Sequence, residues 1–153
     1  MNLSQQLANH IRSAHTGGNY TGVNMQSLLS GITQLQATTK VHNFNTIAAL
    51  VFHINYYAHA VLHALQTGVL DAHDSKSYDC PAINNEEAWQ QLINQLFADA
   101  EALASLIEQW PESKWNEYFI DGKYGTLCRN IAGLIEHTHY HMGQIALIKK
   151  LVQ

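Results

Sequence analysis

Residues 124–152 read YGTLCRNIAGLIEHTHYHMGQIALIKKLV, and the spacing of apolar side chains in this stretch predicts the fold. Core-type positions recur four and three residues apart, which is the period of a helix that packs along one seam. That seam consists of Leu127, Ile131, Leu134, Thr138, His141, Ile145, Ile148 and Val152. Lys149 and Lys150 suit the negative C-terminal end of a helix dipole. We therefore predict one long helix from about Tyr124 to Val152.

Three further stretches show the same helical period, and none alternates apolar and polar residues as a half-buried strand does. They cover residues 4–14, 45–68 and 86–110. The apolar stripe of the first is Leu3, Leu7, Ile11 and Ala14. Residues 25–35 predict a short extra helix across one end. Together these elements predict an all-α protein, a four-helix bundle with long connections, built as a single domain over residues 1–153.

Composition narrows the classes of function. The chain has 153 residues, of which 46% are hydrophobic and 13% charged, and this balance excludes a disordered chain. The formal net charge of -4, with no basic stripe, makes nucleic acid an unsuitable partner. The 10 His outnumber the 8 Lys and Arg residues. Because imidazole is the commonest protein ligand for transition metals, this excess directs attention to metal binding.

The cellular setting is read from what the sequence does not contain. No apolar run reaches the length of a membrane span, so we expect no membrane partner. The first residues have neither the basic nor the apolar region of an export signal. Cys80 and Cys128 are too few for a disulfide framework. We therefore expect a cytoplasmic protein with both thiols reduced.

Three histidines are the candidate metal ligands. His137 and His141 lie four residues apart, so their imidazoles project from one face of the predicted helix and can share an ion. A third ligand must come from another helix, and His53 is the best candidate, because it lies beside the seam of the second long helix. Three neutral imidazoles with an open position are typical of a catalytic zinc-like site. Nickel and iron accept the same ligands.

A simpler interpretation competes with each histidine. A single His in a core seam is more often a hydrogen-bonded buried residue than a ligand. His59 and His63 form another four-residue pair, but they point away from His53, toward solvent or a subunit contact. His139 faces elsewhere between the two proposed ligands. For the histidines of the loops and the first helix we expect surface positions, and these are His10, His15, His42 and His73.

The sequence lacks the residues that several other metal and nucleophile chemistries require. A carboxylate-bridged di-iron bundle needs glutamates from several helices, whereas the second long helix has no Glu or Asp before Asp71. The zinc-protease pattern His-Glu-x-x-His, the Gly-x-Ser-x-Gly elbow and a phosphate-binding glycine loop are all absent. Cys128 is interpreted as a small core residue rather than a nucleophile.

The sequence resembles the DinB-like family of metal-binding four-helix bundles. The resemblance is carried by the His-x-x-x-His-x-Gly-Gln-Ile pattern of residues 137–145, by the Leu-x-x-His-Ile segment of residues 50–54, and by the glycine-rich loop of residues 15–22. It implies that His53, His137 and His141 form the metal triad, that the ion is divalent, most often zinc or nickel, and that the protein is a homodimer. Some relatives carry His where this chain has Asn45, so any role of that His does not transfer.

The resemblance also implies an activity, because characterised members of the family include transferases and isomerases that use low-molecular-weight thiols. We expect a metal-dependent enzyme, a thiol transferase or a hydrolase, in which Tyr57, Tyr140 and Gln144 supply hydrogen bonds near the metal. The alternative is a non-enzymatic dimeric binding module whose metal is structural or absent. An open triad argues against a structural metal, because structural zinc sites are usually closed by four ligands.

Overall fold

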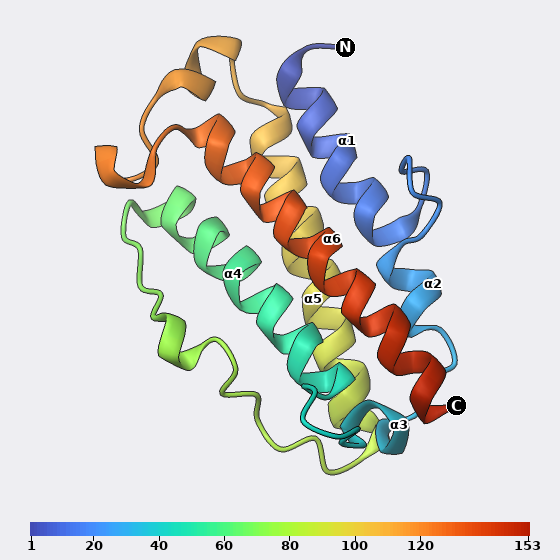
Figure 1. Ribbon diagram of the computed structural model, residues 1–153. Coiled ribbons are helices and arrows are strands. Elements are labelled where there is room, and N and C mark those ends of the chain that lie inside the picture. The colour runs from blue at the N-terminus through green and yellow to red at the C-terminus, as the bar shows by residue number, and fades with distance from the viewer.

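The computed structural model describes residues 1–153 and contains helices but no strand, which confirms the all-α prediction. Its four long helices are α1 (Leu3–Thr16), α4 (Ile47–Thr67), α5 (Glu86–Glu108) and α6 (Leu127–Val152). The shorter elements are α2 (Met25–Leu29), α3 (Gln34–Thr38), η1 (Asp74–Lys76), η2 (Glu112–Asn116) and η3 (Gly122–Tyr124). The long helices lie side by side, with α1 and α4 each contacting both α5 and α6 (Figure 1). No helix combines the length and the apolar character that crossing a membrane requires.

The ends of α4 and α6 follow from local chemistry. Thr46 caps α4 by accepting a hydrogen bond from the Ala49 amide, and Gly68 ends it in the left-handed region, as predicted. Helix α6 begins at Leu127, three residues later than the Tyr124 expected from the sequence. The delay arises because Gly125 has φ +78 and Thr126 provides the N-cap. The preceding residues form η3 instead.

The prediction of one short helix over residues 25–35 was wrong, because the chain forms two. Helix α2 ends at Leu29, and Gly31 then takes φ +75, which breaks the helical path. Thr33 starts α3 with a capping box, in which its hydroxyl accepts from the Gln36 amide. Gly31 and the N-cap residue Thr33, two positions later, therefore outweighed the apolar pattern that spans both helices.

The buried face of α1 is also shifted from the predicted stripe. Leu3 and Leu7 are only half-buried, whereas Ser4 is fully buried. The Ser4 hydroxyl donates to the Trp110 carbonyl at 2.7 Å and accepts from the Trp115 indole N–H at 2.8 Å. A polar residue thus occupies a core position because both of its hydrogen-bonding functions are satisfied there.

Two apolar clusters form the core, one toward each end of the long helices. The first contains Ala58 and Leu134, and the second contains Ile54 and Met142. Buried polar side chains lie at the level between the clusters, and they are His53, Asn55, Asp99, Thr138 and His141. The candidate metal ligands therefore sit at mid-height in the protein, where the apolar packing is interrupted.

The connection between α4 and α5 passes over this level. The start of α4 packs with the start of α5 and the end of α6, so α4 runs parallel to α5 and antiparallel to α6. A parallel pair needs a connection that returns along the whole length of the helices, and residues 68–85 make that return beside α4 (Figure 1). The middle of the connection, including η1, consequently lies beside His53.

Candidate metal centre

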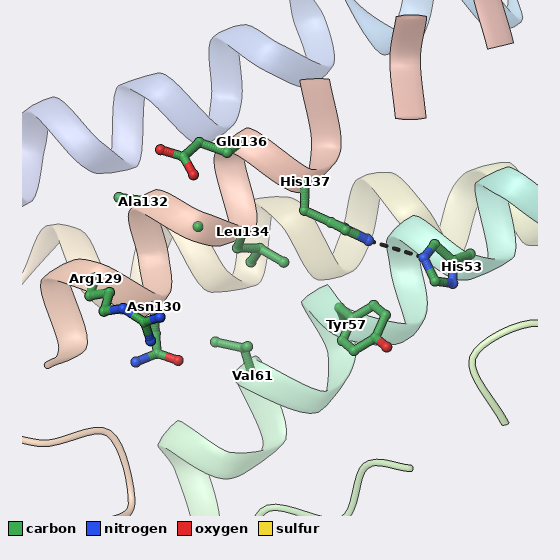
Figure 2. Close-up of a pocket in the computed structure, with 10 residues that line it drawn as sticks. His53, Tyr57, Val61, Arg129, Asn130, Ala132, Leu134, Glu136 and His137 are labelled. Atoms are coloured by element: carbon green, nitrogen blue, oxygen red, sulfur yellow. Dashed lines mark hydrogen bonds between the residues drawn. The ribbon is translucent and has the colours of Figure 1, made fainter. Parts of the chain in front are cut away.

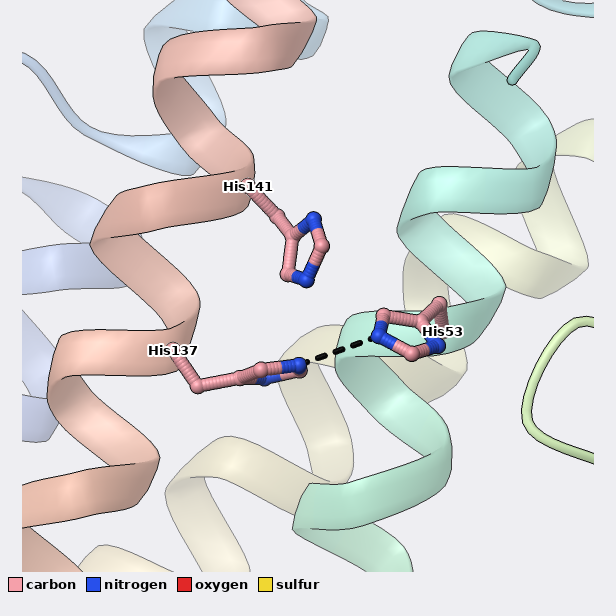
Figure 3. Close-up of side chains that lie close together, drawn as sticks. All are labelled: His53, His137 and His141. Carbon is pink, nitrogen blue, oxygen red and sulfur yellow. Dashed lines mark hydrogen bonds between the residues drawn. The ribbon is translucent and has the colours of Figure 1, made fainter. Parts of the chain in front are cut away.

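Three imidazoles from two antiparallel helices converge at one point. His53 projects from α4, and His137 and His141 project from successive turns of α6 (Figure 3). One nitrogen from each ring lies within 4.8 Å of the other two, and the Nε2 atoms of His53 and His137 are 3.0 Å apart. Two nitrogens bound to one tetrahedral zinc ion are about 3.4 Å apart. The His53–His137 pair is slightly closer than this, and the widest nitrogen pair would have to close by an ångström or more for all three rings to hold one ion.

Hydrogen bonds at the outer nitrogens fix the tautomers of two of these rings. His53 Nδ1 lies 3.1 Å from the Ser77 carbonyl oxygen, and His141 Nδ1 lies 2.7 Å from Gln144 Oε1. Both partners are acceptors, so each Nδ1 carries the proton and each Nε2 presents its lone pair to the centre. Ligand histidines are commonly oriented by such outer partners.

His137 differs from its two neighbours in having no outer partner. Its Nδ1 is buried and makes no hydrogen bond. Burial, together with the neighbouring His141 and His53, lowers the pKa of His137 to about 4. Burial likewise lowers the pKa of His53 below its ordinary value. Both rings are therefore neutral at pH 7, which is the form that binds metal.

Aromatic rings surround the His53 imidazole. Tyr78 stacks on it with a centroid distance of 3.9 Å and an interplanar angle of 10°. Tyr57 places its ring edge-on to His53 at 5.2 Å and to His137 at 5.0 Å. The Tyr57 hydroxyl donates to Asp74 Oδ1 at 2.8 Å, and this bond ties the connection to α4. Sequence reasoning missed the contributions of Asp74, Ser77 and Tyr78, because a non-periodic connection gives no signal of what it covers.

The three residues expected to supply hydrogen bonds occupy different places. Gln144 contacts the triad directly through His141. Tyr57 lines the cavity beside the triad. Tyr140 is 66% exposed and reaches the site only through an edge contact with the His141 ring at 4.9 Å. The structure thus brings Tyr57 and Gln144 to the candidate site and leaves Tyr140 at its rim.

A groove leads away from the triad between α4 and α6. It has a volume of about 510 Å³. Its lining includes His53, Tyr57 and Val61 from α4, and Arg129, Asn130, Ala132, Gly133, Leu134, Glu136 and His137 from α6 (Figure 2). A small molecule held in this groove would reach the triad at one end and the first turn of α6 at the other.

The remaining histidines form no second centre of this kind, since only the triad brings three metal-binding side chains together. His59 points to the other side of α4, where its Nδ1 lies 3.1 Å from the buried Asp99 carboxylate. His63 bonds the Val69 carbonyl. His15, expected at the surface, is instead buried, which corrects that prediction. Its Nδ1 bonds the Ile11 carbonyl at 2.8 Å, and its Nε2 has no partner.

Comparison with known proteins gives one match. The family model described as the DinB superfamily matches residues 20–145, which include all three histidines of the triad. No curated protein and no solved structure matches the chain.

Proposed function

The chain belongs to the DinB superfamily, and from that premise we propose that it is a metal-dependent enzyme. In this proposal His53, His137 and His141 hold one divalent ion within a four-helix bundle. The observation that carries the proposal is the convergence of three imidazole nitrogens, two of them on rings whose outer nitrogens are already hydrogen-bonded.

The donor set favours zinc or nickel, and iron is also accepted by imidazole ligands. Three protein ligands leave coordination positions open for water or substrate, as in catalytic zinc sites. A divalent ion held by the three imidazoles would lower the pKa of a coordinated water or thiol and would so supply a nucleophile at neutral pH. The adjoining groove offers the space that an acceptor molecule needs.

The roles of the surrounding residues follow from their contacts. Gln144 orients His141 by accepting a hydrogen bond from its Nδ1–H group. Tyr57 packs its ring against His53 and His137, and burial raises the pKa of its phenol, so its hydroxyl stays protonated and donates to Asp74. Tyr140, at the rim, is available to an incoming ligand. We propose transfer of a low-molecular-weight thiol as the reaction, with hydrolysis by a coordinated water as the second candidate.

Metal analysis tests the first part of this proposal. Protein loaded with zinc or nickel and then desalted is expected to retain about one ion per chain, and His53→Ala or His137→Ala is expected to retain far less. His63→Ala is the matched control, because His63 lies on the same helix but outside the triad. Equal retention in all four proteins would contradict the triad as the binding site.

A kinetic comparison tests the second part. Metal-loaded and chelated protein are each mixed with 2-mercaptoethanol and 1-chloro-2,4-dinitrobenzene, and formation of the thioether is followed by absorbance. The proposal expects a rate above background only with metal. Stoichiometric metal without any rate enhancement, with thiols or with ester substrates, would favour the non-enzymatic binding module.

We also propose that the protein is a homodimer. An exposed apolar row on the outer face of α6 consists of Leu147 and Leu151. Phe44, itself 55% exposed, adjoins this row across a groove of about 530 Å³. Sedimentation equilibrium is expected to give twice the monomer mass, and Leu147→Glu, which places a charge in the row, is expected to give monomers. A cytoplasmic location and the lack of a nucleic-acid partner stay predictions from the sequence.

A further inference from the structure

The groove beside the triad has a distinct chemistry at its far end. One wall carries His53, Tyr57 and Val61, spaced four residues apart on α4. Asn130 and Gly133 lie on the same side of α6 as His137, because they precede it by seven and four residues. The groove therefore runs along both helices, from the imidazoles to the first turn of α6 (Figure 2).

Arg129 lines this far end and has no acidic partner. No carboxylate oxygen lies within ion-pair distance of its guanidinium, whereas Arg12, the other arginine of the chain, is paired with Glu101 at 2.9 Å and Glu108 at 3.0 Å. Glu136 also lines the groove, but its carboxylate is directed away from Val61 (Figure 2). A positive charge thus faces the groove without compensation.

The Arg129 side chain is exposed, but two contacts with the preceding turn fix its course. Its Nη1 donates to the Tyr124 carbonyl at 3.0 Å. Its Cδ lies so close to Gly125 that a Cβ there would be 2.9 Å away, so the stem packs directly over the glycine. The remaining N–H groups have no partner within the chain, and a guanidinium presents them in a planar fork that matches a carboxylate or phosphate.

From these contacts we infer that the groove takes a small elongated organic anion, whose anionic group pairs with Arg129 while its other end carries the atom that binds the metal. This inference rests on the proposed function of the triad. Eight residues separate Arg129 from His137, which corresponds to about 12 Å along the helix. A ligand about this long can contact Arg129 and the triad at once, whereas a shorter ligand reaches only the triad.

Gly133 lines the groove between Arg129 and the triad. A Cβ built at this position meets no atom within 4 Å, so a side chain there would project into the groove without disturbing the packing. The glycine lies within α6, where alanine or leucine favours the helix more than glycine does. Blocking variants at this position are therefore expected to fold.

Thiol binding to the cobalt-loaded protein tests the inference, because a thiolate bound to cobalt gives an absorption band independent of turnover. The probes are 8-mercaptooctanoate, its neutral analogue 8-mercaptooctanol, and 3-mercaptopropionate, which is too short to reach Arg129. We expect the long acid to bind about tenfold more tightly than the long alcohol, as a charge-assisted contact provides. Arg129→Gln is expected to abolish this preference without changing the affinity for 3-mercaptopropionate.

Two controls accompany these measurements. Lys40→Gln removes the same charge from an exposed position outside the groove and is expected to keep the preference. Gly133→Leu is expected to weaken the binding of both long thiols and to leave the binding of the short one unchanged. Gly133→Ala is expected to leave the binding of all three thiols unchanged. An acid-to-alcohol ratio that is the same in wild type and Arg129→Gln would overturn the inference while the band still reports thiol binding. Absence of the band with every thiol would overturn the proposed thiol transfer, and the inference with it.

Discussion

The hydrogen bond between Gln144 and His141 leads to a prediction in which two substitutions of Gln144 change the metal affinity in opposite directions. The amide oxygen accepts a hydrogen bond from the Nδ1–H group, with 2.7 Å between the two heavy atoms, and so holds the ring with Nε2 free for metal. In Gln144→Leu nothing accepts that hydrogen bond, and the ring is free to turn or to carry its proton on Nε2, where it cannot bind metal. In Gln144→Glu the acceptor becomes a carboxylate, which bonds the imidazole more strongly and raises its basicity.

The size of the effect follows from the structure. A single neutral hydrogen bond in a half-buried position contributes about 0.5–1.5 kcal/mol. Loss of an outer partner of a metal-bound histidine weakens metal affinity by about tenfold to a hundredfold, because orientation and tautomer are lost together. We therefore expect Gln144→Leu to weaken zinc or nickel binding by about 1.4–2.8 kcal/mol, and Gln144→Glu to strengthen it.

Competition with a chromophoric chelator at neutral pH measures these affinities. The melting temperature of the metal-free proteins is the control, and it is expected to change little, since Gln144 is only half-buried. His141→Ala sets the scale for complete loss of the ligand. If Leu and Glu at position 144 shift the affinity in the same direction, or if neither shifts it by more than about twofold, Gln144 does not orient the ligand.

Three further predictions concern stability and the connection. Trp89→Phe removes the indole N–H that bonds the Ile32 carbonyl at 2.8 Å in the core, and it is expected to lower the free energy of unfolding by about 2–4 kcal/mol in urea titrations. Burial lowers the pKa of His15, so the unfolded chain takes up the proton first and wild type loses stability as the pH falls below about 6.5. His15→Leu, which cannot be protonated, should show a shallower loss between about pH 7 and pH 5 by the same titrations. Tyr57→Phe removes the bond to Asp74 and is expected to speed amide hydrogen exchange in residues 74–80 while leaving exchange in α4 unchanged.

The long helices were predictable because each carries its own start, seam and stop. Thr46 and Gly68 delimit α4 through side-chain and backbone chemistry that needs no distant partner. Positions that depend on distant partners were not predictable in this way. Ser4 is buried because two tryptophans from beyond the end of α5 satisfy its hydroxyl, and no pattern within α1 announces them. His15 is buried for a similar reason, since its Nδ1 bonds within α1 while α5 covers its ring through Phe97.

The same distinction between local pattern and distant partners applies to the residues of the candidate site. The four-residue spacing of His137 and His141 places both rings on one face of α6 whatever the rest of the chain does. His53 could be added because it lies beside the seam of a helix that must pack nearby. Tyr78 and Ser77 could not be found this way, because their positions depend on the path of the α4–α5 connection across the helices.

That path also explains why the connection is long. Because α4 and α5 are parallel, residues 68–85 must travel back along the protein, and they cross the level at which the apolar core gives way to buried histidines. A backbone carbonyl is the partner that His53 receives there, so no substitution at Ser77 can remove the contact directly. The orientation of His53 is thus tied to the path of the connection, whereas that of His141 depends on one side chain. His137 has no hydrogen-bond partner at its outer nitrogen. Substitutions that loosen the connection should therefore affect metal binding through His53 even where they touch no ligand.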